Sequence, residues 1–89
     1  QSYFSNFTQA VGKVKFVNKK PKQLTVDLPI DYYGQAETIG ITQYVTEQAE
    51  KYFDNIDEYE IRIKDGNTPR ALISKSKDDK EPQVHIYHN

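Results

Sequence analysis

The clearest hydrophobic pattern in the chain lies between Gln35 and Ile56. Its apolar positions follow one another at intervals of four, four, three, one and three residues: Ile41, Val45, Ala49, Tyr52, Phe53 and Ile56. This spacing places them on one side of an α-helix, because a helix completes a turn every ~3.6 residues. Charged residues take the outward positions: Glu47, Glu50, Lys51 and Asp54. A helix with a single apolar stripe is unstable alone in water, so the pattern predicts a surface for it to cover.

The start of this helix has two interpretations. Thr38 could cap it, or the chain could turn at Gly40 and begin the helix at Ile41. A glycine inside the helix would cost about 1 kcal/mol relative to alanine.

Two alternating segments precede the helix and predict a β-hairpin. In residues 13–17 lysine alternates with apolar residues, so Val14 and Phe16 share one face. Residues 23–29 place Leu24, Val26 and Leu28 on one face and end at a proline. The polar residues 18–22 between them have a loop composition. We therefore expect an antiparallel hairpin with one buried face.

Three further alternating segments follow the helix and predict a three-strand meander. They span residues 58–64, 70–76 and 83–88, with polar turns at 65–69 and 77–82. The expected inward residues are Tyr59, Ile61 and Ile63 in the first segment and Val84 and Ile86 in the last, and the middle segment is centred on Leu72 and Ile73.

Residues 1–12 show a second helical stripe, which Gly12 would end. The fold expected from all these elements is α+β. An antiparallel sheet of about five strands (the hairpin plus the meander) would carry the central amphipathic helix and the N-terminal helix on one face. We expect residues 1–89 to form a single domain.

The composition excludes some kinds of site but does not identify a function. The 89 residues are 36% hydrophobic and 28% charged with a net charge of -1, as in an ordinary globular domain. There is no cysteine, which excludes disulfides and cysteine metal clusters. There is also no methionine, so we expect an excerpt of a longer protein.

Candidate catalytic and metal-binding groups are scarce. His85 and His88 are three residues apart on one expected strand and would point to opposite faces. No serine occupies a nucleophile motif, and the acidic pairs lie at turns and element ends. We expect no enzymatic activity, no catalytic residues, no metal and no cofactor.

Two clusters are candidate interaction sites. Five lysines occur within ten residues: Lys13, Lys15, Lys19, Lys20 and Lys22. They could bind wall polymer, anionic lipid or nucleic acid. We favour the simpler interpretation that edge lysines keep the hairpin from pairing with other sheets. Tyr32 and Tyr33 lie in an expected loop, where they could contact a partner or cover the core.

The residues from Leu24 to Ile56 and from Glu58 to Asn89, with the segment before them, resemble the C-terminal end of the CamS family. These are staphylococcal lipoproteins described as sex pheromone precursors. The resemblance covers the whole chain and implies a lipid-anchored protein on the outer face of a Gram-positive membrane. It implies no catalytic residues, and the pheromone would come from a signal peptide that these residues do not contain.

The leading hypothesis is therefore a non-enzymatic extracytoplasmic interaction domain, anchored to the membrane only through an upstream lipid. Its partner would be a cell-surface protein or wall polymer, and no nucleic acid is expected. The alternative is a small nucleic-acid- or ribosome-associated domain that uses the lysine-rich hairpin. That alternative requires a contiguous basic face.

Overall fold

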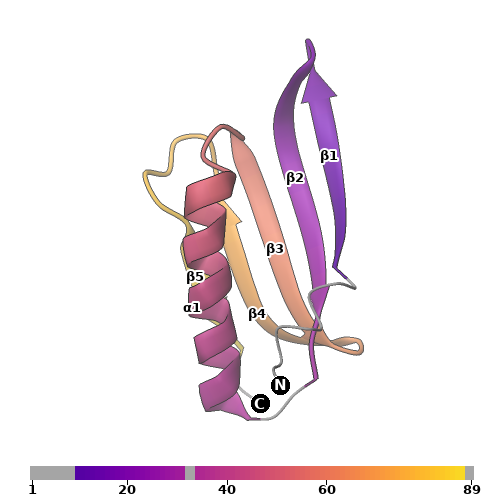
Figure 1. The fold of residues 1–89 in the computed structure, drawn as a ribbon, viewed down its shortest axis with the longest axis vertical. Coiled ribbons are helices and arrows are strands. Elements are labelled where there is room, and N and C mark those ends of the chain that lie inside the picture. The colour runs from indigo at the N-terminus through magenta and orange to yellow at the C-terminus, as the bar shows by residue number, and fades with distance from the viewer. Residues whose placement is uncertain (1–9, 32–33, 88–89) are drawn as a thin grey trace.

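The computed structural model describes residues 10–31 and 34–87, which form a five-stranded sheet with one helix against it (Figure 1). In chain order the elements are β1 (Val11–Val17), β2 (Lys20–Pro29), α1 (Gln35–Tyr52), β3 (Glu58–Asp65), β4 (Thr68–Lys75) and β5 (Gln83–Ile86). The strands lie side by side in the order β1-β2-β3-β4-β5. The α+β class is as predicted.

The sheet is mixed, so the prediction of an antiparallel sheet is wrong at one place. β2 and β3 pair in parallel, while the other three neighbouring pairs are antiparallel. The cause is α1, which carries the chain back along the sheet so that β3 begins at the same end as β2 (Figure 1). A parallel pair needs such a crossover connection.

Helix α1 begins earlier than either predicted start. Gly34 precedes the first helical residue with φ 138°, a conformation that favours glycine. Thr38 lies within the first turn, where its hydroxyl donates to the carbonyl oxygen of Gly34 at 3.1 Å. Gly40 is inside the helix.

The helix also ends before the predicted stripe does. It stops at Tyr52, and the N–H of Phe53 donates to the carbonyl of Ala49 at 2.8 Å. Ile56 is buried beyond the helix end, and Phe53 packs against the core. Tyr52 is 62% exposed, so its inward assignment is wrong.

The core lies between α1 and the face of the sheet that α1 covers. Its buried apolar members are Leu24, Leu28, Ile30, Ile41, Val45, Ala49, Ile56, Tyr59, Ile61, Ile63, Ala71 and Ile73. On β3 every second residue is buried, as the alternation predicted. The helix adds Thr38 and Thr42, which are buried although polar. The core therefore centres on α1, β3 and β4.

The hairpin of β1 and β2 forms as predicted, but its apolar face is only partly buried. Leu24 and Leu28 of β2 belong to the core, whereas every residue of β1 is exposed. Val14 and Phe16 therefore do not share the buried face that their alternation predicted. The helix predicted over residues 1–12 lies mostly outside the described residues, and its last two positions, Val11 and Gly12, are in β1.

Candidate interaction surfaces

The lysine cluster follows the hairpin from β1 through its turn into β2. Lys13 and Lys15 point to the sheet face opposite α1, because they pair across the strands with Thr25 and Gln23. Lys19 lies in the turn with φ 69°, and Lys20 is the first residue of β2.

Lys22 differs from the other four lysines because it has an acidic partner. Its ammonium group donates to the Asp57 carboxylate at 2.9 Å. This hydrogen bond and the accompanying charge attraction raise the pKa of Lys22 and lower the pKa of Asp57. Lys22 thus ties the hairpin to the chain just before β3.

Acidic side chains share the sheet face that carries Lys13 and Lys15. Thr25 lies between Lys13 and Glu60 in the register of the sheet, and Gln23 lies between Lys15 and Glu58. Two strand spacings separate each lysine from the corresponding glutamate, or about 10 Å. The lysines therefore form a basic edge and not a contiguous basic face.

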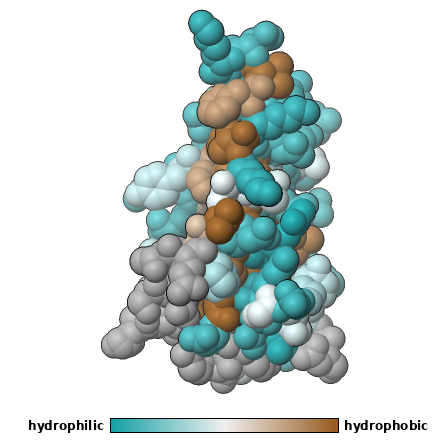
Figure 2. All heavy atoms as spheres, turned by 90° about the vertical axis from the view of Figure 1, so that its right-hand side faces the viewer, coloured by the Kyte–Doolittle hydropathy of each residue, from teal (hydrophilic) through white to brown (hydrophobic). Residues whose placement is uncertain are grey.

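β1 also exposes apolar side chains along its whole length. The β1 apolar row consists of Val11, Val14, Phe16 and Val17, which are 55%, 44%, 62% and 43% exposed. Figure 2 views the molecule onto the β1 side and shows brown apolar patches in a broken vertical row between teal polar side chains. Isolated exposed apolar residues are common, but a row confined to one strand marks a candidate contact surface.

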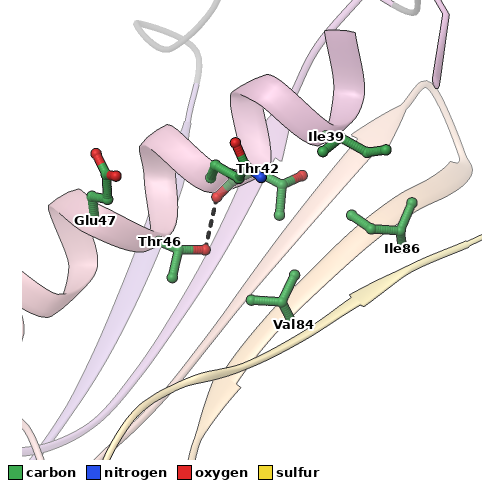
Figure 3. Close-up of a pocket in the computed structure, with 7 residues that line it drawn as sticks. Ile39, Thr42, Thr46, Glu47, Val84 and Ile86 are labelled. Carbon is green, nitrogen blue, oxygen red and sulfur yellow. Dashed lines mark hydrogen bonds between the residues drawn. The ribbon is translucent and has the colours of Figure 1, made fainter. Parts of the chain in front are cut away.

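A second surface lies between α1 and β5. Ile39, Thr42 and Thr46 of the helix face Val84 and Ile86 of the strand across a groove of about 420 Å³ (Figure 3). The groove is open because Ile39 is 38% and Val84 48% exposed. Val84 was predicted to point inward, and it does so only into this groove. Ile39, an apolar residue next to the predicted stripe, was the sequence signal for this groove. It was not included in the stripe.

Other sequence candidates contribute little here. Tyr32, Tyr33 and His88 lie outside the described residues. His85 is exposed on β5, and its ring meets that of Tyr87 edge-on, with the centroids 4.6 Å apart. Within residues 10–31 and 34–87, no three His, Asp or Glu side chains come together in a way that could hold a metal ion. In the same part of the chain, no helix is both long and apolar enough to cross a membrane.

Solved structures share this fold over nearly the whole chain. The C-terminal domain of the sex pheromone staph-cAM373 precursor from Staphylococcus aureus is 83% identical, with a TM-score of 0.89 over 98% of this chain and 27% of that chain. A sex pheromone precursor from Lactobacillus salivarius is 14% identical, with a TM-score of 0.78 over 98% of this chain and 28% of that one. The second of these shows the fold alone.

A third structure, of a sex pheromone staph-cAM373 precursor, is 20% identical with a TM-score of 0.78, and it too shows the fold. The match covers 96% of this chain and 32% of that chain. The chain therefore spans between about a quarter and a third of the length of the structures it matches. No curated protein matches it.

The family comparison agrees with the fold and with the sequence resemblance. The pattern of the CamS family, described as the CamS sex pheromone cAM373 precursor, matches residues 1–81. That match covers most of the elements, from β1 to the turn before β5. The chain therefore belongs to the CamS family of sex pheromone cAM373 precursors.

Proposed function

We propose that this chain is a non-enzymatic, extracytoplasmic interaction domain of a lipid-anchored pheromone precursor, and that it binds another protein through the β1–β2 hairpin. Membership of a precursor family supports an extracytoplasmic location. The proposed anchor is a lipid on an upstream part of the longer protein. The folded domain then has a role separate from that of the released peptide.

One observation carries the protein-binding proposal: β1 exposes an apolar row and lysines side by side. An anionic wall polymer or RNA would require a continuous positive field. Glu58 and Glu60 interrupt that field on the lysine face, and Lys22 is already paired with Asp57. Exposed apolar residues interspersed with charged ones on one strand are typical of a protein interface.

A photo-crosslinking experiment on staphylococcal cells tests this role. A benzophenone amino acid replaces Phe16 in the full-length precursor, and in a control precursor it replaces the exposed Asn67 of the β3–β4 turn. We expect a discrete protein adduct from position 16 and none from position 67. Purified wild-type domain should compete with this adduct, and a Val14→Ser/Phe16→Ser domain should not. Adducts at position 16 with lipid or polymer, or none at all, would contradict the proposal.

The location is tested separately by cell fractionation. The full-length precursor should be found in the membrane fraction and be digested by protease added to intact cells. Blocking lipoprotein maturation should change its electrophoretic mobility. A precursor protected from external protease would contradict the extracytoplasmic location without bearing on the hairpin.

A further inference from the structure

β1 is an edge strand whose outer side has no partner among the described residues. It lies first in the strand order, and within residues 10–31 and 34–87 only β2 pairs with it. An edge strand presents backbone N–H and C=O groups that can bond to an added strand. Figure 1 shows β1 outermost, on the side of the sheet away from α1.

The two faces of β1 have different chemistry. Val14 and Phe16 alternate onto the face that α1 covers elsewhere, and Gly12 on that face lies close to Leu24 and Val26. Lys13 and Lys15 alternate onto the opposite face, between Val11 and Val17. Their cross-strand neighbours Thr25 and Gln23 are uncharged. No ion pair joins Lys13, Lys15, Lys19 or Lys20 to another described residue.

From this arrangement we infer that the open edge of β1 accepts an extended protein segment in which apolar residues alternate with acidic ones. The segment adds to the sheet as a sixth strand. Its apolar side chains lie beside Val14 and Phe16, and its carboxylates lie beside Lys13 and Lys15. Side chains directly opposite on neighbouring strands are about 4.5–5.5 Å apart at Cβ, so each lysine reaches a carboxylate. The inference rests on the proposed protein-binding function and specifies its occupant.

Charge decides against a second copy of β1 at the same edge. Two β1 strands paired antiparallel would place the lysines of both chains on one face, with no acidic residue of β1 between them. Like charges facing each other across strands are destabilising. The lysines thus disfavour pairing between two copies of β1 and favour binding of an acidic segment. The same side chains therefore oppose aggregation and confer specificity.

The length of the apolar row decides against a membrane surface. A bilayer touched by the hairpin turn would contact Phe16 and Val17. Val11 is six residues from Val17 along β1, or about 20 Å at the rise of a strand. Strand addition accounts for exposure along the whole of β1.

The inference is tested by titrating the 89-residue chain, labelled with ¹⁵N, with synthetic peptides. The first probe is a capped peptide of alternating valine and glutamate, as long as the seven residues of β1. One control peptide has the same composition with the glutamates grouped at one end, and the other replaces glutamate by lysine. We expect amide shifts and slowed hydrogen exchange in β1 with the first peptide only.

A charge-reversed domain provides the sharper test. Lys13→Glu with Lys15→Glu removes two attractive pairs and creates two repulsive ones, so binding of the glutamate peptide should weaken at least about tenfold. The same variant should gain binding to the lysine peptide. The matched control, Lys77→Glu with Lys80→Glu in the β4–β5 loop, makes the same change in net charge and should leave binding unaltered. Thermal melts should show that both variants fold, since Thr25 and Gln23 are uncharged.

Three outcomes would overturn the inference: equal binding of the grouped and alternating peptides, equal effects of the two double variants, or binding to anionic vesicles without binding to the peptide. None of these outcomes bears on the crosslinking experiment at position 16, which tests protein binding separately. A protein adduct at position 16 with no response to charge reversal would retain protein binding and exclude this mode of strand addition.

Discussion

At the scale of single residues, Tyr59 is the most unusual member of the core. It is 3% exposed, and its ring packs edge-on against Phe53 with the centroids 5.6 Å apart. Its hydroxyl is buried without a hydrogen-bond partner among the described residues. Burial, with the nearby charges of Glu50 and Asp54, raises the pKa of this hydroxyl. An unpaired buried hydroxyl costs stability that a hydrogen atom in its place would not.

Replacing Tyr59 by phenylalanine should therefore stabilise the domain by about 1 kcal/mol at neutral pH. The raised pKa adds a pH dependence with a definite sign. The contribution of Tyr59 to the free energy of unfolding is fully present below the usual tyrosine pKa of 10.0. It is lost as the pH rises through the higher pKa of the folded state. Urea titrations at neutral and alkaline pH measure both effects. A destabilised Tyr59→Phe domain would mean that the hydroxyl has a partner in solution.

The Lys22–Asp57 pair gives a second residue-scale prediction, on the acid side. The pKa of Asp57 is lowered from 3.8, so its contribution is complete above about pH 5 and disappears as the pH falls through the lowered folded value. Asp57→Asn should lower the melting temperature slightly at neutral pH, and the difference from wild type should disappear as the pH falls through the lowered folded pKa of Asp57. Both partners are largely solvated, so added salt should also reduce the difference. A gap that persisted in acid would show that the amide disturbs packing.

At the scale of the elements, α1 places threonines on its inner face. The hydroxyls of Thr42 and Thr46 donate to the carbonyl oxygens of Thr38 and Thr42, each at 2.7 Å. Bonded in this way, a threonine is compatible with a dry helix face. Ile41, Val45 and Ala49 are buried, as their spacing predicted. The apolar spacing could not predict the buried threonines, because it depends on residue type and not on the hydrogen bonds that their hydroxyls make within the helix.

The prediction at this scale concerns Gly40 inside α1 and Gly34 just before its first residue. A Cβ added at Gly40 would have nothing within 4 Å, and the residue is inside the helix. Gly40→Ala should therefore raise the free energy of unfolding by about 1 kcal/mol. Gly34 is the matched control, because its φ of 138° strains any residue with a side chain. Gly34→Ala should destabilise by about 1 kcal/mol or more. Chemical denaturation of both variants measures the contrast, and a stabilising Gly34→Ala would contradict the assigned helix start.

At the scale of the whole molecule, α1 covers the sheet unevenly. Of the strands, α1 packs closest against β4 and β5, and the hairpin extends beyond it on the other side (Figure 1). The β1 apolar row is exposed for this reason. The groove beside β5 arises at the opposite border of the helix. Both candidate surfaces thus lie at the borders of the part of the sheet that α1 covers.

Because α1 covers the sheet unevenly, two apolar substitutions should change the free energy of unfolding by very different amounts. Ile63 is completely buried at the centre of the core, so Ile63→Ala should cost roughly 2–5 kcal/mol. Phe16→Ser removes a larger side chain from an exposed position and should change stability by no more than about 0.5 kcal/mol. The midpoints of chemical denaturation of the two variants, each compared with wild type, measure this difference. A large loss for Phe16→Ser would mean that the row is covered within the chain and is not a free surface.

The sequence by itself determined the local elements. Period-two alternation located the strands, and period-3.6 spacing located α1, because both depend only on which side chains share a face. It also identified the family, and its lysines marked the edge strand. The tertiary structure decided the parallel pairing of β2 with β3 and the exposure of Val14 and Phe16. Alternation shows that two faces differ, but only the position of α1 determines which part of the apolar face is covered.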